Sequence, residues 1–161
     1  MRARSLALLT IMVAVGALAV MFFFTRQDDR TRNDALLFLD RYQALDLDDP
    51  IEERRQRVDA LDALPFASEE VERVRDACVG AHRTLIVAEE RGAEARAIFE
   101  RETDHGRIAE SDLPTEVRAS IEAALSESNE ALPRAREELR TCMDDARRLE
   151  VRFQPRRRAE R

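Results

Sequence analysis

The sequence predicts an all-α protein: an N-terminal transmembrane helix followed by a small helical bundle that is dominated by a long, coiled-coil-like antiparallel two-helix hairpin. Three observations favour this fold class. Twenty uncharged residues follow one another near the N-terminus, and apolar residues recur at helical spacing through most of the remaining chain. Among 161 residues, the 5% aromatic content, four glycines and five prolines supply few strand and turn signals and no glycine-rich loop that would hold a phosphate.

The uncharged run covers residues 5–24 and is flanked by arginines. As a helix it would be about 30 Å long, which matches the hydrocarbon thickness of a bilayer. We therefore expect residues 5–25 to form a transmembrane signal-anchor helix and residues 1–4 a short cytoplasmic tail. A cleavable signal peptide, cut after the Ala-Leu-Ala of residues 17–19, is the alternative. It is disfavoured because signal sequences have shorter apolar runs, of roughly 7 to 15 residues.

The arginines are nearly balanced on the two sides of this run, so other features set the predicted orientation. A short basic tail before an N-terminal apolar run favours translocation of the chain that follows, and paired cysteines suit an oxidising compartment. We expect a single-pass protein of the bacterial inner (cytoplasmic) membrane. The lipid bilayer would be its partner through residues 5–25, with the helical domain, residues 26–155, outside the cytoplasm.

Two short helices should precede the hairpin. One apolar stripe predicts a helix over residues 33–45, with Ala35, Phe38, Tyr42 and Leu45 on one face. The sequence Asp48-Asp49-Pro50 is typical of a helix start and predicts a second helix that runs to about Leu64. Its apolar side would carry Ile51, Val58 and Leu61.

The hairpin helices are predicted over about 69–104 and 115–153, because apolar or small residues recur there in alternating steps of three and four. The first seam consists of Val71, Val74, Cys78, Ala81, Leu85, Ala88, Gly92, Ala95 and Phe99. The second consists of Ile121, Leu125, Ser128, Leu132, Ala135, Leu139, Cys142, Ala146, Leu149 and Phe153.

The register of the hairpin follows from a turn centred near residue 110, which makes the numbers of facing residues add up to about 220. Cys78 then faces Cys142 and Gly92 faces Ser128, while most other layers set a large residue against a small one, as interdigitated packing requires. Pro133 interrupts the second helix. Because the seam keeps its phase on both sides, we expect a kink there; a break after about Glu130 is the alternative.

The two cysteines are predicted to form a structural disulfide across the hairpin. Closing a loop between Cys78 and Cys142 would stabilise the fold by about 4 kcal/mol in the chain-entropy model. One alternative is a metal site formed by Cys78, His82, Cys142 and Glu138, since His82 lies one turn from Cys78 and Glu138 falls opposite His82. No Cys-x-x-Cys pair supports it. Free buried thiols are the remaining alternative.

Each histidine also has a simpler interpretation than a ligand. His82 is expected to be a partly buried polar residue at the edge of the seam. His105, beside Gly106, is expected to interact with the carbonyl groups at a helix end.

Charge is distributed unevenly along the chain. Residues 30–155 contain 30 acidic residues and 20 arginines, so we expect no nucleic-acid partner. The basic tail, residues 156–161, holds four arginines and could contact anionic lipid headgroups or an acidic partner. We favour a disordered tail.

The sequence offers no catalytic residue and no cofactor site, so we expect no enzyme. It favours a membrane-anchored extracytoplasmic helical protein that acts as a non-enzymatic interaction or structural module of the cell envelope. Its helix faces would contact a protein partner or a second copy. One alternative is a metal- or ligand-binding bundle that uses Cys78, His82 and Cys142. Another is a phage-type inner-membrane lysis protein, which has the same layout of short tail, single span and long outer helices but shares no residue motif with this chain.

Overall fold

The structure is a computed structural model that describes residues 28–103, 109 and 112–154. These residues are helical or lie in connections, contain no strand, and pack as a helical bundle, which confirms the predicted all-α class. The predicted span at 5–25 and the predicted tail at 156–161 lie outside the described residues. Among the residues that are described, no helix is long and apolar enough to cross a membrane.

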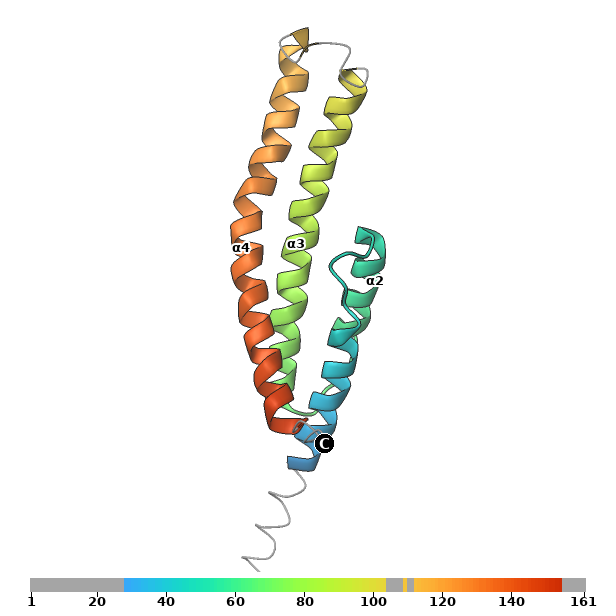
Figure 1. Cartoon of the computed structure of the whole chain (residues 1–161), viewed down its shortest axis with the longest axis vertical. Coiled ribbons are helices and arrows are strands. Elements are labelled where there is room, and N and C mark those ends of the chain that lie inside the picture. The colour runs from blue at the N-terminus through green and yellow to red at the C-terminus, as the bar shows by residue number, and fades with distance from the viewer. Residues whose placement is uncertain (1–27, 104–108, 110–111, 155–161) are drawn as a thin grey trace, which may run out of the picture.

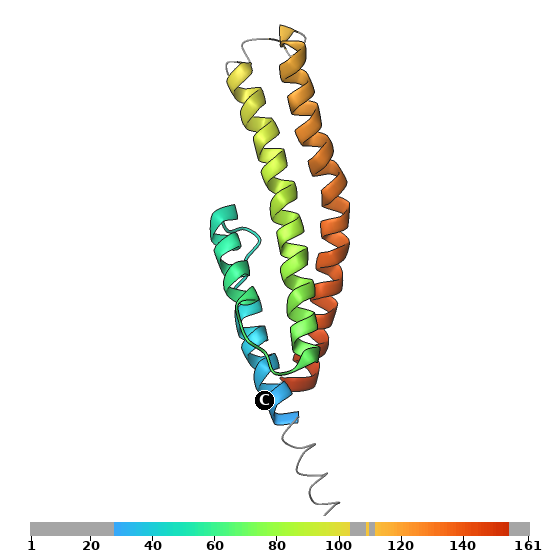
Figure 2. The same cartoon turned by 180° about the vertical axis from the view of Figure 1, so that it is seen from behind.

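A long hairpin and a short hairpin make up the bundle (Figure 1). The long hairpin consists of α3, Glu69–Glu102, and α4, Thr115–Phe153, which are about 51 and 58 Å long at the usual helical rise. The short hairpin consists of the helix over residues 28–43 and α2, Ile51–Asp62. Both views of the ribbon show the short hairpin lying along only one half of the long one (Figures 1 and 2).

The observed ends of the two long helices are close to those that the sequence predicts, whereas the first short helix, predicted over 33–45, is observed over 28–43. The starts of α3 and α4 coincide with the predicted starts, and α3 ends two residues before residue 104. Pro133 lies inside α4, which continues on both sides of it, so the alternative of a broken last helix is wrong. Pro133 supplies no N–H group for a helical hydrogen bond. The packing of neighbouring seam residues against α3 keeps this turn of α4 helical nevertheless.

Asp34, which belongs to the 28–43 helix, caps the start of α3. Ser68 occupies the N-cap position of α3, but its side chain makes no capping hydrogen bond. Instead, the backbone N–H groups of Ala67 and Ser68 both donate to Oδ2 of Asp34, each at 2.8 Å. A carboxylate that accepts such bonds at a helix start satisfies otherwise unpaired donors and interacts favourably with the helix dipole.

Three contacts along the long hairpin confirm the predicted register. Cys78 and Cys142 form a disulfide with a Cα–Cα distance of 4.9 Å. Nearer the connection between the helices, Arg91 pairs with Glu127 at 2.9 Å. At the opposite end Arg152 pairs with Glu70, also at 2.9 Å. The two helices therefore stay in one antiparallel alignment over most of their length.

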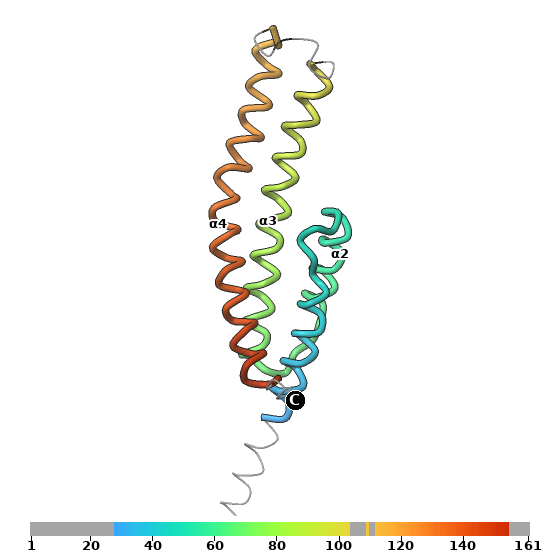
Figure 3. Tube along the Cα trace, in the orientation of Figure 1, coloured from blue at the N-terminus to red at the C-terminus, as the bar shows by residue number. Residues whose placement is uncertain are grey.

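The two ends of the described chain meet at one end of the bundle, which we call the base. The start of the 28–43 helix and the end of α4 lie there, and the end of α3 and the start of α4 lie at the opposite end, the tip (Figure 3). Phe153 belongs to the same buried cluster as Ala35 and Phe38, so the end of α4 is packed against the first described turns.

The hydrophobic core lies in the half of the bundle that contains the base. All four helices contribute to one cluster of buried side chains, namely Ala35, Phe38, Leu39, Val58, Leu61, Val71, Cys78, Val79, Ala81, Ile86, Cys142, Ala146, Leu149 and Phe153. Towards the tip the long hairpin continues alone, and its buried seam residues there, Ala95 and Ser128, are small. Phe99 and Leu125, two residues of the predicted seam, remain 37% and 43% exposed, so the seam is only partly buried there.

Candidate functional site

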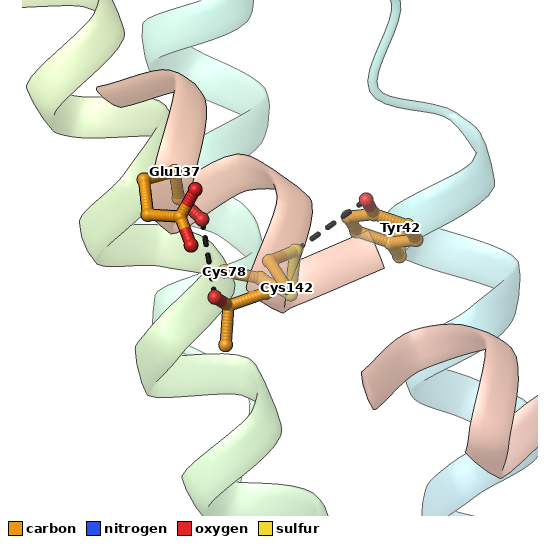
Figure 4. Close-up of a disulfide and its surroundings, with 5 residues drawn as sticks. Tyr42, Cys78, Glu137 and Cys142 are labelled. Carbon is orange, nitrogen blue, oxygen red and sulfur yellow. Dashed lines mark hydrogen bonds between the residues drawn. A yellow bond between two sulfur atoms is a disulfide. The ribbon is translucent and has the colours of Figure 1, made fainter. Parts of the chain in front are cut away.

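The disulfide lies where all four helices meet, and it confirms the predicted pairing of Cys78 with Cys142. Both cysteines are fully buried. The hydroxyl oxygen of Tyr42 lies 3.4 Å from Sγ of Cys142, and because a disulfide sulfur carries no hydrogen, the hydroxyl is the donor (Figure 4). Burial raises the pKa of Tyr42, so this donor stays protonated. The short hairpin thus covers the disulfide and contacts it directly.

His82 follows one helical turn after Cys78 and faces the short hairpin. It is only 5% exposed, and its ring and the ring of Tyr42 form a T-shaped contact with centroids 6.2 Å apart. Burial, and secondly the positive charge of Arg54, lower the pKa of His82. The expectation of a partly buried residue at the seam edge therefore underestimates its burial. The 28–43 helix and α2 cover a face of α3 that the hairpin alone would leave open to water.

Arg54 of α2 is the residue that sequence reasoning missed. Its side chain is 95% buried and pairs with both carboxylate oxygens of Glu89 on α3, while Nε donates to the carbonyl oxygen of Asp49 at 3.1 Å. A buried arginine needs such a partner because an uncompensated charge in the interior is costly. The sequence does indicate that Arg54 is buried, because it lies on the same helix face as Ile51, Val58 and Leu61 and interrupts their apolar stripe.

Further ion pairs connect α2 to α3 along their outer edges. Arg55 pairs with Glu90, and Arg83 donates to Asp59 at 2.7 Å and to Asp62 at 2.9 Å. These side chains are largely exposed, so each pair contributes at most about 1 kcal/mol. Their order along both helices fixes α2 antiparallel to α3 and places its first turn beside Glu89 and Glu90.

Cys78, Cys142, His82 and Glu138, the residues of the alternative metal site, are not arranged as a set of metal ligands. The disulfide uses both sulfurs that would have bound the metal. The carboxylate of Glu138 accepts a hydrogen bond from Arg134 at 2.8 Å, and its pKa is lowered by Arg134 first and by the hydroxyl of Thr84 second. Within residues 28–103 and 112–154, no group of three or more His, Cys, Asp or Glu side chains is placed to hold a metal ion. His105 and Gly106 lie outside these ranges.

A groove of about 580 Å³ lies between α3 and α4, at the level where Arg83 of α3 pairs with Asp59 and Asp62 of α2. Val87, which is 51% exposed, lines the groove together with Thr84 and Ala131. Its charged lining residues are Arg83, Glu127, Glu130 and Arg134. An exposed apolar strip bordered by charges is suited to contact with another protein surface rather than to chemistry.

Comparison of the chain with protein-family models, with curated proteins and with solved structures gives no match. We therefore infer function from the fold and its contacts.

Proposed function

We propose that the protein is a membrane-anchored, extracytoplasmic helical protein that acts as a non-enzymatic interaction or structural module of the cell envelope. The observation that carries this proposal is the shape of the bundle. The long hairpin begins at the base, where the described chain starts at residue 28, and it extends about 50 Å to a tip that the other helices do not cover.

The buried disulfide supports the extracytoplasmic side. Structural disulfides form and persist in oxidising compartments such as the periplasm, whereas thiols in the cytosol are kept reduced. Cys78 and Cys142 are joined within the buried cluster of the core. Together with the short basic tail before the apolar run, this favours the domain lying outside the cytoplasm.

The uncovered half of the long hairpin supports an interaction role. Its two helices are held in register but bury only a narrow seam, so most of their surface is available to a partner. Phe99 and Leu125 offer exposed apolar side chains there, and Val87, at the level of α2, is 51% exposed beside the groove between α3 and α4. Rigid helices with such surfaces are suited to protein contacts, because little conformational entropy is lost when a partner binds.

Three measurements on cells test the proposal. A reporter that is active only outside the cytoplasm, fused after Arg161, should be active, and the chain should stay in the membrane fraction after alkaline extraction. A photo-reactive amino acid at Val87 or Leu125 should then give discrete cross-linked products in living cells. The same group at Leu47, an exposed apolar residue in the connection before α2, is the control.

The two parts of the proposal can fail separately. A reporter that is active only in the cytoplasm would contradict the assigned compartment and, with it, the role in the envelope. A membrane-bound chain that gives no discrete product from Val87 or Leu125, or the same products as from Leu47, would contradict an interaction surface on the long hairpin.

A further inference from the structure

The attachment of α2 to the bundle differs from that of α3 and α4 to each other. In both views of the ribbon α3 lies between α2 and α4, and α2 packs against α3 but not against α4 (Figures 1 and 2). The two long helices are also joined by the disulfide between Cys78 and Cys142, whereas α2 contains no cysteine. The contacts of α2 can therefore open while those of the long hairpin stay in place.

α2 covers the part of α3 that carries His82. The ion pairs between the two helices set an alignment that places Leu61 at the level of His82 and Val58 at the level of Ile86. All four side chains are buried, and Val58, Leu61 and Ile86 belong to the common core cluster. If α2 separates from α3, His82 and Ile86 lose this cover and meet water.

The groups around His82 are poorly suited to a positive charge on its ring. Tyr42 of the 28–43 helix is neutral and contacts the ring, and Arg54 of α2 adds a positive charge. The carboxylates at this level of the described helices are already engaged by arginines, namely Glu89 by Arg54, Asp59 and Asp62 by Arg83, and Glu138 of α4 by Arg134. A proton on His82 would place a second buried cation beside Arg54, and such a charge is costly without a carboxylate of its own.

The direction of the resulting pH effect follows from linkage. Burial, and secondly the charge of Arg54, lower the pKa of His82 from its ordinary value of 6.5 while α2 is in place. Once α2 has separated, the ring is solvated and takes up a proton near the ordinary pKa. Acid therefore favours the separated state, and its population relative to the packed state rises by up to about tenfold between pH 7.5 and pH 5.5.

We propose that α2 is an acid-sensitive cover on α3: as the pH falls below neutrality, His82 takes up a proton, α2 separates from α3, and the face that carries His82 and Ile86 is uncovered while the long hairpin stays folded. In acid this face is added to the apolar surface that the long hairpin already exposes. The mechanism uses only residues of the helical domain and does not depend on the proposed membrane anchor.

Hydrogen exchange of the full chain in a mild detergent, read by mass spectrometry, tests the proposal helix by helix. After correction for the intrinsic effect of pH, the amides of α2 should open more often at pH 5.5 than at pH 7.5, by up to about tenfold. They should also open more often than those of residues 135–149 in α4. Low concentrations of urea should affect them less, because separation of one short helix exposes less surface than unfolding of the bundle.

Two outcomes of this experiment would overturn the inference. Equal opening of α2 and of residues 135–149, with the same dependence on urea, would mean that the bundle unfolds as one unit. Opening of α2 that is the same at pH 7.5 and pH 5.5 would mean that no proton is taken up when α2 separates.

A pair of histidine variants assigns the proton. His82→Gln keeps a polar side chain but cannot be protonated, so the opening of α2 should no longer change between pH 7.5 and pH 5.5. His105→Gln removes the other histidine of the chain and should retain the change. A pH dependence that survives in His82→Gln would overturn the role of His82.

The pH profile of the unmodified chain makes the test independent of how well a variant folds. The opening of α2 should be constant above about pH 7.5 and should rise with the uptake of at most one proton below about pH 6.5. A steeper rise, or a rise that begins only below about pH 5, would assign the effect to carboxylates and overturn the inference.

Discussion

Gly92 of α3 lies directly against Ser128 of α4: a Cβ atom on Gly92 would lie 3.3 Å from the hydroxyl oxygen of Ser128. That hydroxyl is buried and donates a 2.8 Å hydrogen bond to the carbonyl oxygen of Ala88. The two helices are therefore joined here by a side chain that reaches the backbone of the opposite helix. A small residue at position 92 leaves space for that contact.

Substitutions at Gly92 should differ from the same substitutions at Gly80. An added Cβ meets nothing within 4 Å at Gly80, so Gly80→Ala should stabilise the fold by up to about 1 kcal/mol through helix propensity. Gly92→Ala should gain less, since the Ser128 hydroxyl must move. Gly92→Leu should cost about 1–3 kcal/mol through overpacking, and Gly80→Leu should not. Urea unfolding of the full chain in a mild detergent measures these differences, and equal effects at the two glycines would contradict the close approach.

The register of the long hairpin was predictable because two independent features of the sequence agree on it. Cys78 and Cys142 face each other in the same alignment that sets Gly92 against Ser128, and antiparallel seams allow few alternatives once both helices are long and regular. Pro133 does not change this outcome, because the packing along α4 compensates for one missing N–H group.

The ion pair of Arg54 and Glu89 should contribute much more to stability than its neighbour, Arg55 with Glu90. Glu89→Ala leaves the buried guanidinium without a carboxylate and should destabilise the fold by about 3 kcal/mol. Glu90→Ala, the matched control, removes an exposed partner and should cost less than about 1 kcal/mol. Chemical unfolding measures both. Equal losses would mean that Arg54 is solvated in solution.

The packing of the short hairpin was not predictable from the sequence in the same way. The seam accounts for the face of α3 that meets α4, but Val79, His82 and Ile86 form a second buried stripe beside it. A helix that is apolar on two adjacent stripes must be covered by further helices, yet the pattern does not say by which ones. Arg54 and Glu89 are 35 positions apart in the sequence, and the local periodicity of apolar residues does not predict a pairing over such a separation.

His82 should make the stability of the fold depend on pH near neutrality. Its pKa is lowered from the ordinary value of 6.5, so the unfolded chain takes up a proton at a higher pH than the folded one. The contribution of the neutral imidazole is fully present above about pH 6.5 and is lost as the pH falls towards the folded-state pKa. The free energy of unfolding should therefore decrease between pH 7.5 and pH 5.5, a range in which carboxylates with ordinary pKa values stay ionised.

Two histidine variants identify the group responsible. His82→Gln, which cannot take up a proton, should remove most of the decrease between pH 7.5 and pH 5.5. His105→Gln should retain it. If the unmodified chain and His82→Gln lose stability in parallel, burial of a neutral His82 is not the source of the pH dependence.

Removing the disulfide should lower stability without changing the native fold. The bond closes a loop between residues 64 positions apart, and the chain-entropy model attributes about 4 kcal/mol to such a constraint on the unfolded chain. The double variant Cys78→Ala with Cys142→Ala should thus keep its helical circular dichroism but unfold at a much lower urea concentration. Because both cysteines are fully buried, dithiothreitol should reduce the bond only in unfolded molecules, so alkylation followed by mass spectrometry should find no modified cysteine until urea is added. Rapid reduction of the native chain would instead mean that the short hairpin opens often, since Tyr42 and its neighbours must move before a thiol can reach Cys142.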